Sequence, residues 1–204
     1  PFDVPFRGIT VREVMLFRGS ERISEWAAFP EYSDRGAARW LATTLEQAFH
    51  PGFLHDAVSH APISVNATFP ALHPKEISGW WQKFPGAKSA KMKVVERAGS
   101  LQADIERAEA VRKTIGDQAL LRLDANGRWS IDEAEHALLR LSEFSIDYIE
   151  QPVSTIPELM ELKSRLQGSG IRLAADELIR ESNGLKQVIS AGVVDVAVLK
   201  VSPL

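Results

Sequence analysis

The chain has 204 residues, of which 45% are apolar and 25% are charged, as in an ordinary globular protein. Its net charge of −3 gives no sign of a nucleic acid or an anionic membrane surface as a partner. No apolar run approaches the roughly 18–20 residues of a membrane-spanning helix. The absence of cysteine excludes disulfide bonds and thiolate metal sites, and it fits a cytoplasmic protein.

The first 61 residues lack the regular alternation of apolar runs and helices that the rest of the chain shows, and we expect residues 1–61 to form a separate domain. Residues 8–17 (GITVREVMLF) read as a strand, and residues 37–49 (AARWLATTLEQAF) read as a helix. The segment 23–33 (ISEWAAFPEYS) lies between them. Residues 50–62 are rich in histidine, proline and glycine, which predicts a linker.

From residue 62 to residue 204, short apolar runs alternate with amphipathic helices. Six strands are predicted, over residues 63–69, 90–95, 120–125, 147–152, 171–177 and 194–201. Helices are predicted between them over 101–115, 130–141 and 154–166. This alternation predicts βα units around a parallel sheet.

The predicted helices carry their own start signals. Ser130 and Glu133 match an S-x-x-E capping box, and Thr155 or Ser154 can cap a helix that has Pro157 in its first turn. The helix over 101–115 places apolar residues on one face at helical spacing: Leu101, Ile105, Ala108, Val111 and Ile115.

Four charged residues fall near the carboxyl ends of successive predicted strands. Asp124, Glu150 and Asp176 are spaced 26 residues apart, and Lys200 follows 24 residues later. In (β/α)8 barrels, catalytic side chains gather at these strand ends and face one mouth. A doubly wound sheet usually has a Gly-rich turn such as G-x-G-x-x-G, which is absent from the sequence. We therefore predict a (β/α)8-type, TIM-like barrel over residues 62–204.

Three carboxylates on neighbouring strand ends are suitable ligands for a hard cation such as Mg2+, with Mn2+ as the alternative. Taken alone, each acid has a simpler interpretation, because the sequence around Asp124 (DANG) also favours a turn. The near-constant spacing of Asp124, Glu150 and Asp176 favours the metal site.

Two lysines share one face of the strand over 90–95, because Lys91 and Lys93 are two residues apart. Lysines can also protect an edge strand from aggregation, but this strand is predicted to lie inside the sheet. Near a divalent cation and partly desolvated, these lysines should have a lowered pKa and could accept a proton. Lys200 is predicted to lie on the opposite side of the mouth from Lys93. Two opposed lysines suit removal of a proton next to a carboxylate.

The segments KMK, LDANGRW, YIEQP, AADE and VLK, in this order and spacing, resemble the enolase superfamily. They resemble its lysine-bearing subgroup, which includes muconate lactonising enzymes, dipeptide epimerases and o-succinylbenzoate synthases. The mandelate-racemase subgroup is disfavoured, because it has a Glu as third metal ligand and a His–Asp pair. The segments FRGITVREVMLF, EWAAFPEYS and PISVNATFPA resemble the actinobacterial-type o-succinylbenzoate synthases of menaquinone biosynthesis.

This resemblance implies an N-terminal α+β capping domain and a Mg2+-dependent lyase in the barrel. The implied reaction is syn-elimination of water from 2-succinyl-6-hydroxy-2,4-cyclohexadiene-1-carboxylate, a small carboxylate, to give 2-succinylbenzoate. The implied metal ligands are Asp124, Glu150 and Asp176.

The resemblance also assigns roles to the remaining polar residues. Lys93 would be the general base and then the acid, Lys200 would stabilise the enediolate, and Lys91 would assist electrostatically. Asn126 would support the metal carboxylates. The segment 24–32 resembles the family's lid loop, with Phe29 and Tyr32 as pocket walls.

Two other functions stay open: N-succinylamino acid racemase or dipeptide epimerase, and a non-catalytic relative that keeps the barrel. The resemblance further implies that the barrel is truncated after its sixth strand. We therefore expect the 204 residues to be part of a protein of roughly 300 residues or more, and to be inactive alone.

Overall fold

The computed structural model describes residues 9–30, 32–52, 63–95, 100–180 and 183–200. The chain divides into two compact units, one of Pro1–Pro62 with Leu199–Leu204 and the other of Ile63–Val198. The predicted linker over 50–62 falls mostly outside the described residues. Among the described helices, none is long and apolar enough to cross a bilayer.

The smaller unit contains a two-stranded antiparallel sheet and one long helix in its described part. Strand β1 (Met15–Arg18) pairs with β2 (Ile23–Trp26), and helix α1 (Asp34–Phe49) follows. The helix begins at Ser33, whose hydroxyl accepts a hydrogen bond from the Gly36 N–H. The predicted helix is therefore confirmed, with a start three residues earlier.

The strand predicted over 8–17 was too long, because in the described residues the strand is β1, from Met15 to Arg18. Strand β2 occupies the start of the segment 24–32, whose interpretation as a lid loop stays a prediction. Helix α1 holds β2 in place, because the Ser24 hydroxyl donates to the Thr44 carbonyl and the Thr44 hydroxyl donates to the Glu25 carbonyl. These contacts between distant residues are not visible in a local pattern.

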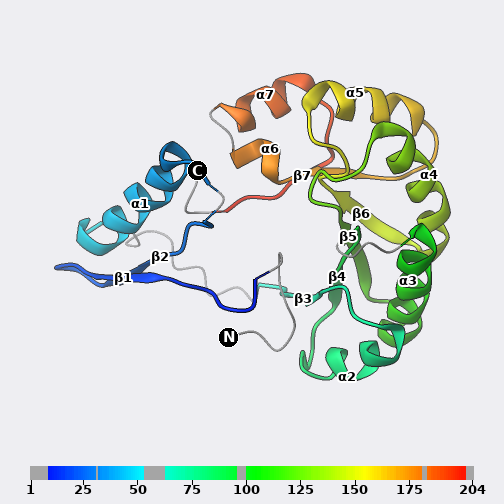
Figure 1. Ribbon diagram of the computed structural model, residues 1–204, viewed down its shortest axis with the longest axis horizontal. Coiled ribbons are helices and arrows are strands. Elements are labelled where there is room, and N and C mark those ends of the chain that lie inside the picture. Colours follow the sequence, from blue (N-terminus) through cyan, green and yellow to red (C-terminus); the bar gives the residue numbers. More distant parts are fainter. Residues whose placement is uncertain (1–8, 31, 53–62, 96–99, 181–182, 201–204) are drawn as a thin grey trace. The chain divides into compact units, whose positions relative to one another are not determined.

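The larger unit is built on a parallel sheet, which in the described residues has six strands in sequence order (Figure 1). They are β3 (Asn66–Phe69), β4 (Ser89–Lys93), β5 (Leu120–Asp124), β6 (Ile146–Glu150), β7 (Leu173–Ala175) and β8 (Val196–Ala197). Each neighbouring pair is parallel. The predicted alternation is confirmed, and β4 lies between β3 and β5, so the edge-strand explanation of its lysines is wrong.

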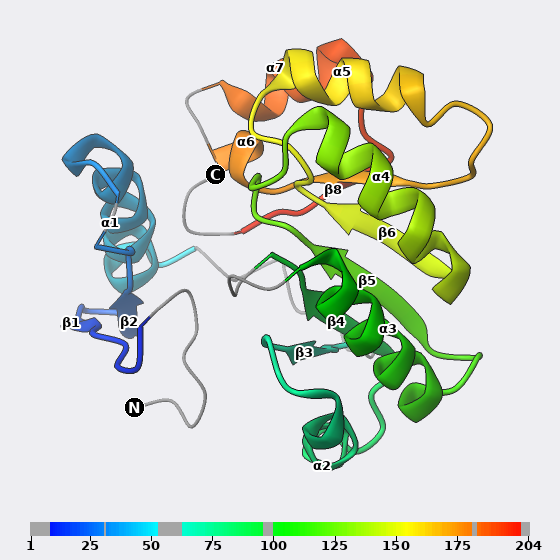
Figure 2. The same cartoon turned by 45° about the vertical axis from the view of Figure 1, so that its right-hand side comes forward.

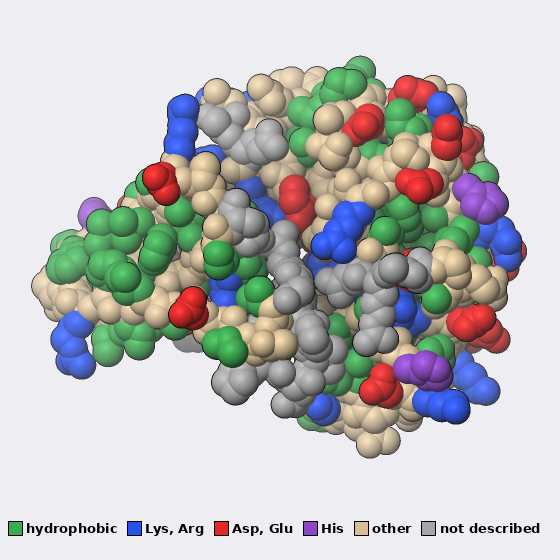
Figure 3. All heavy atoms as spheres, viewed as in Figure 1, with side chains coloured by type: hydrophobic (Ala, Val, Ile, Leu, Met, Phe, Trp, Pro, Cys, Tyr) green, Lys and Arg blue, Asp and Glu red, His purple; other side chains and the backbone are tan. Residues whose placement is uncertain are grey.

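Helices connect these strands. They are α2 (Ile77–Trp81), α3 (Leu101–Ile115), α4 (Ile131–Leu141), α5 (Ile156–Arg165), α6 (Glu177–Arg180) and α7 (Gly184–Ala191), with short 3-10 turns at Pro74–Glu76 and Ser142–Phe144. Figures 1 and 2 show α3, α4 and α5 on one side of the sheet. The surface over these helices mixes acidic and basic side chains (Figure 3).

Side-chain alternation on the strands separates the core from the charged face. On β5, the fully buried Leu121 and Leu123 alternate with Arg122 and Asp124. Leucines of α4 and α5, such as Leu138 and Leu162, are also fully buried and complete the core. The other face of the sheet therefore carries the charged residues.

The predicted helix caps are confirmed. The Ser130 hydroxyl accepts a hydrogen bond from the Glu133 N–H, and the Glu133 carboxylate accepts one from the Ser130 N–H. Thr155 rather than Ser154 is the N-cap of α5, and it forms the same reciprocal pair with Glu158.

The buried face predicted for α3 is only partly right. Ala108 and Val111 are buried, but Leu101, Ile105 and Ile115 are only half-buried. The other buried residues of α3 are Asp104 and Arg107, which form an ion pair and are each 6% exposed. The pair is buried because its atoms bond to the strand ends, as described below.

The last predicted strand was also too long. It was expected over 194–201, but β8 is limited to Val196–Ala197. Its neighbour β7 has only three residues, which restricts the pairing to Ala174 with Val196 and Ala175 with Ala197.

Candidate active site

Charged side chains stand in one row at the carboxyl ends of three adjacent strands. Lys93, the last residue of β4, pairs in register with Asp124, the last residue of β5. Asp124 pairs in turn with Glu150, the last residue of β6. Because paired residues on adjacent parallel strands point to the same face, the three side chains are neighbours.

Both lysines of β4 contact the acids of this row. Lys93 Nζ lies 2.6 Å from Asp124 Oδ2, and Lys91 Nζ lies 3.1 Å from the same oxygen. Lys91 Nζ also donates to the two carboxylate oxygens of Glu150, at 3.0 and 3.1 Å. The predicted common face of Lys91 and Lys93 is thus present in the structure.

The third predicted acid follows the next strand. Asp176 comes one residue after β7, and its Oδ2 lies 2.9 Å from the Arg180 guanidinium. The same guanidinium lies 2.7 Å from Glu177 Oε1. Sequence reasoning missed Arg180, although its spacing of four residues from Asp176 on a short helix could have indicated the pair.

Asn126 is part of the same network. Its side-chain oxygen accepts a hydrogen bond from Lys93 Nζ at 2.6 Å, and its amide nitrogen donates to Glu177 Oε1 at 3.0 Å. Its backbone N–H donates to Asp124 Oδ1 at 3.1 Å, and its φ of 51° is in the left-handed region. The turn interpretation of DANG is therefore confirmed, and the functional interpretation of Asp124 stays a prediction.

Burial and charge set the acid–base properties of the row. Burial opposes ionisation of Asp124, but Lys91 and Lys93 outweigh it and hold the pKa of Asp124 below its ordinary value. Burial, together with the charge of Asp124, raises the pKa of Glu150 to about 7 despite the contact with Lys91.

The pKa of Lys91 in the structure differs from the lowered value predicted near a cation. Burial lowers its pKa, but the carboxylates of Asp124 and Glu150 more than compensate, and the pKa of Lys91 lies above its ordinary value. The prediction of a lowered pKa assumed that a bound cation neutralises these carboxylates. Without that cation, the acids hold the proton on Lys91.

The donor set suits a hard cation. Asp124 and Glu150 are 1% exposed and Asp176 is 3% exposed, and oxygen ligands from adjacent strand ends are what Mg2+ requires. Buried carboxylates need a counter-charge, which lysines and Arg180 supply here. Within the described residues, no group of three or more His, Asp or Glu side chains is arranged so that it could hold a metal ion. The metal role of these acids therefore stays a prediction.

A buried ion pair on helix α3 supports the backbone at the end of β4, and sequence reasoning missed it. Arg107 of α3 lies 2.6 Å from Asp104, and its Nε donates to the Leu72 carbonyl at 2.9 Å. Arg107 also donates to the Lys93 carbonyl at 3.4 Å, and Asp104 accepts from the Val95 N–H at 3.1 Å. The pair thus fixes the chain at and just after Lys93.

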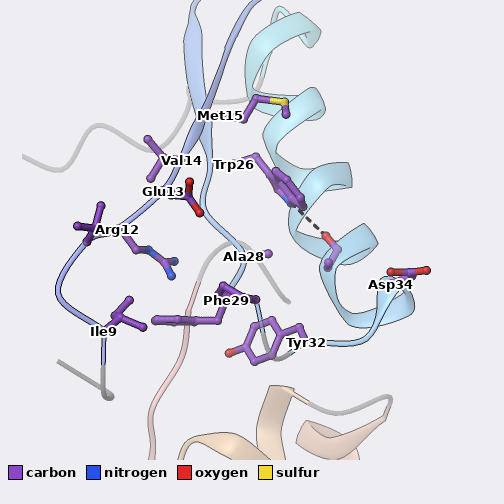
Figure 4. Close-up of a pocket in the computed structure, with 13 residues that line it drawn as sticks. Ile9, Arg12, Glu13, Val14, Met15, Trp26, Ala28, Phe29, Tyr32 and Asp34 are labelled. Atoms are coloured by element: carbon purple, nitrogen blue, oxygen red, sulfur yellow. Dashed lines mark hydrogen bonds between the residues drawn. The ribbon is translucent and has the colours of Figure 1, made fainter. Parts of the chain in front are cut away.

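The predicted lid residues lie on a cavity of about 500 Å3 within the smaller unit (Figure 4). Phe29 and Tyr32 are in edge-to-face contact, with ring centroids 5.8 Å apart. The Arg12 guanidinium lies 3.8 Å from the Phe29 ring centroid and donates to the Ala27 carbonyl. Trp26 donates from its indole N–H to the Ala37 carbonyl. A substrate-binding role for Phe29 and Tyr32 stays a prediction.

Lys200 follows the last described strand of the sheet. It lies three residues after β8 and belongs to the unit that contains Pro1–Pro62. The expectation that it ends a barrel strand was wrong, because β8 stops at Ala197. Its expected position opposite Lys93 stays a prediction.

Comparison with known families gives two matches along the chain. Residues 79–204 match the family described as "Enolase C-terminal domain-like". Residues 1–48 match the family described as "Enolase N-terminal domain-like".

A curated relative is similar over the whole chain. The o-succinylbenzoate synthase of Mycobacterium ulcerans (strain Agy99) is 42% identical over 205 residues, which cover 100% of this chain and 60% of that protein. The chain therefore spans about 60% of the length of this relative.

Solved structures share the fold. A dipeptide epimerase from Enterococcus faecalis has a TM-score of 0.68 at 17% identity, covering 95% of this chain and 73% of that one. A dipeptide epimerase from Cytophaga hutchinsonii, crystallised with Mg and the dipeptide D-Ala-L-Val, has a TM-score of 0.67 at 21% identity. That match covers 89% of this chain and 61% of the epimerase.

Proposed function

The chain belongs to the family of proteins with an enolase-like C-terminal domain, and on this premise we propose that it is the catalytic part of an o-succinylbenzoate synthase. The proposed reaction is the elimination of water from 2-succinyl-6-hydroxy-2,4-cyclohexadiene-1-carboxylate to give 2-succinylbenzoate, in menaquinone biosynthesis. The observation that carries the proposal is the 42% identity to the Mycobacterium ulcerans enzyme across the entire chain.

We propose Mg2+ as the cofactor, with Asp124, Glu150 and Asp176 as the residues that would hold it. Two observations support this assignment: the three carboxylates are buried, and the structurally similar epimerase from Cytophaga hutchinsonii was crystallised with Mg. When bound, the cation would supply positive charge that stabilises the negative charge developing on the substrate carboxylate.

Lys93 is proposed as the residue that moves the proton. As a neutral amine it takes the proton from the carbon next to the substrate carboxylate. The electron pair of that carbon–hydrogen bond first moves into the substrate carboxylate and gives an enediolate. It then returns to form the new ring double bond while the neighbouring carbon–oxygen bond breaks. Lys93 then gives the proton to the departing hydroxide, which leaves as water on the same face.

The contacts of Lys93 fit this role. Its nitrogen is held by Asp124 and Asn126, each at 2.6 Å, so its position at the strand end is fixed before substrate arrives. To act as a base, Lys93 has to exchange these contacts for contact with the substrate. Lys91 remains charged between Asp124 and Glu150 and contributes positive potential. Lys200 is proposed to stabilise the enediolate from the opposite face.

The experiment is a direct assay of the purified product of the native gene. It should convert the cyclohexadiene carboxylate to 2-succinylbenzoate in the presence of MgCl2 and lose this activity with EDTA. The same preparation is incubated with N-succinylamino acids. Rapid racemisation without any dehydration would contradict the proposal.

A second candidate function is that of an N-succinylamino acid racemase or dipeptide epimerase. The observation that favours it is the fold similarity to two dipeptide epimerases. Epimerisation requires proton transfer on both faces of the substrate, so it would need Lys200 as a second acid–base residue. For either function we propose a cytoplasmic enzyme that acts on a small carboxylate and binds no nucleic acid or membrane.

A further inference from the structure

Gln151 follows Glu150 directly, and none of the roles described above uses it. It is the first residue after β6 and is 0% exposed. Its φ of 43° lies in the left-handed region that favours glycine. A buried polar residue in this conformation persists only where its surroundings hold it in place.

The side chain of Gln151 bonds to the segment that carries Asp176. Its Oε1 accepts hydrogen bonds from the Asp176 N–H at 3.1 Å and from the Leu178 N–H at 3.3 Å. These N–H groups lie at the start of α6, where backbone donors have no partner within the helix. The Gln151 amide nitrogen donates to the Val153 carbonyl at 2.7 Å, which fixes the orientation of the side chain.

The backbone of Gln151 joins the neighbouring strand ends as well. Its N–H donates to the Ala174 carbonyl of β7 at 2.8 Å, and its carbonyl accepts from the Gly127 N–H at 2.7 Å. Gly127 follows β5 by three residues, in the turn that contains Asn126. A single residue thus links the carboxyl ends of β5, β6 and β7.

We propose that Gln151 is a positioning residue that sets the distance between the carboxylates of Glu150 and Asp176. Glu150 is its covalent neighbour, and Asp176 is held through its backbone N–H. The inference rests on the proposed function only in giving these two acids a cation to bind. Groups that orient metal ligands typically change metal affinity when they are removed.

The first test measures Mg2+ and Mn2+ affinity by calorimetry in Gln151→Met. This variant keeps the length of the side chain but neither accepts from Asp176 and Leu178 nor donates to Val153. We expect affinity to fall by about 10–100-fold while the circular dichroism spectrum is unchanged. The control is Gln167→Met, the same change at an exposed residue, which should bind as the wild type does. Wild-type affinity in folded Gln151→Met would overturn the proposal.

The second test does not depend on a cation. In the metal-free wild type, the Asp176 and Leu178 amides should exchange their hydrogens as slowly as the β6 amides, and Gln151→Met should accelerate both. Fast exchange in the wild type would overturn the proposal, even if Gln151→Met fails to fold. If the wild type binds neither Mg2+ nor Mn2+, the proposed function fails. The exchange pattern still decides whether Gln151 holds the backbone at Asp176 in place.

Discussion

The sheet of the larger unit carries two groups of charged side chains that are arranged differently. The carboxyl-end cluster consists of Lys91, Lys93, Asp124 and Glu150. The amino-end cluster consists of Asn66, Arg122, Asp147 and Arg172. In the amino-end cluster, each Asp147 oxygen has its own guanidinium, at 2.9 Å from Arg122 and 2.9 Å from Arg172. In the carboxyl-end cluster, two lysines share one oxygen of Asp124.

Burial sharpens this difference. The side chains of Arg122, Asp147 and Arg172 are 23%, 14% and 50% exposed, so water screens part of their charge. Asp124 and Glu150 are each 1% exposed and stand side by side, and Asp124 opposes ionisation of Glu150. Paired charges near water stabilise a fold modestly, whereas crowded buried charges with a shifted pKa are typical of functional sites.

The largest expected effect follows from removing the proton carrier of the carboxyl-end cluster. In the full-length product of the native gene, Lys93→Met should reduce turnover of the cyclohexadiene carboxylate by about 100-fold to 10,000-fold, because general acid–base catalysis is lost. Cation binding should persist, since the three carboxylates remain. The measurement is kcat at saturating substrate, with Lys88→Met as the control. Lys88 is exposed just before the same strand, and its variant should keep full activity. Activity retained in Lys93→Met would show that the base lies elsewhere.

A second prediction concerns pH in the cation-free protein. The pKa of Glu150 is about 7 in the folded state against an ordinary 4.5, so the folded state keeps a proton that the unfolded state releases in this range. Stability should therefore fall as pH rises from 4.5 to about 7, by on the order of 3 kcal/mol. Urea unfolding in EDTA at about pH 5 and about pH 8 measures the loss.

Two variants make this pH prediction specific. Glu150→Gln is neutral at every pH and should flatten the profile, whereas Asp147→Asn, in the amino-end cluster, should leave the slope in place. An unchanged slope in Glu150→Gln would assign the pH dependence to another group.

The two clusters also differ in how far the sequence predicts them. The carboxyl-end cluster was predictable because Lys93, Asp124 and Glu150 end apolar runs at regular spacing, and parallel strands bring such ends together. The helix caps at Ser130 and Thr155 were predictable for a different reason, because each depends only on residues three positions apart.

The remainder depends on contacts between distant residues. Arg107 is not among the residues predicted for the apolar face of α3, yet it is buried because it reaches the Leu72 carbonyl, 35 residues away. Strand β2 pairs with β1 and is also held by the hydrogen bond from Ser24 to Thr44, 20 residues away. The raised pKa of Lys91 in the absence of a cation depends on its contacts with Asp124 and Glu150, which lie 33 and 59 residues away in the sequence.

A third prediction weakens the amino-end cluster. Arg122→Met removes the bond from Nε to Asp147, the bond at 2.9 Å to Asn66 Oδ1 and the contact with the Tyr148 ring. We expect the free energy of unfolding to fall by about 1–3 kcal/mol, because a partly buried carboxylate loses a charged partner. Turnover per folded molecule should be unchanged, which urea unfolding and a kcat measurement on the same sample can test. A specific loss of turnover would extend the functional site to this cluster.

The smallest effect is expected at the solvent-exposed edge of the same cluster. Arg172 is 50% exposed and pairs with Asp147 at 2.9 Å, and exposed ion pairs contribute about 0–1 kcal/mol. Arg172→Met should therefore lower the unfolding free energy by less than Arg122→Met does. Added salt should reduce the loss caused by Arg172→Met further, because it screens the exposed ion pair. The double variant should lose more than the sum of the singles, because Asp147 then keeps neither guanidinium. A strictly additive result would mean that the two arginines act independently, contrary to the shared neutralisation of one partly buried carboxylate.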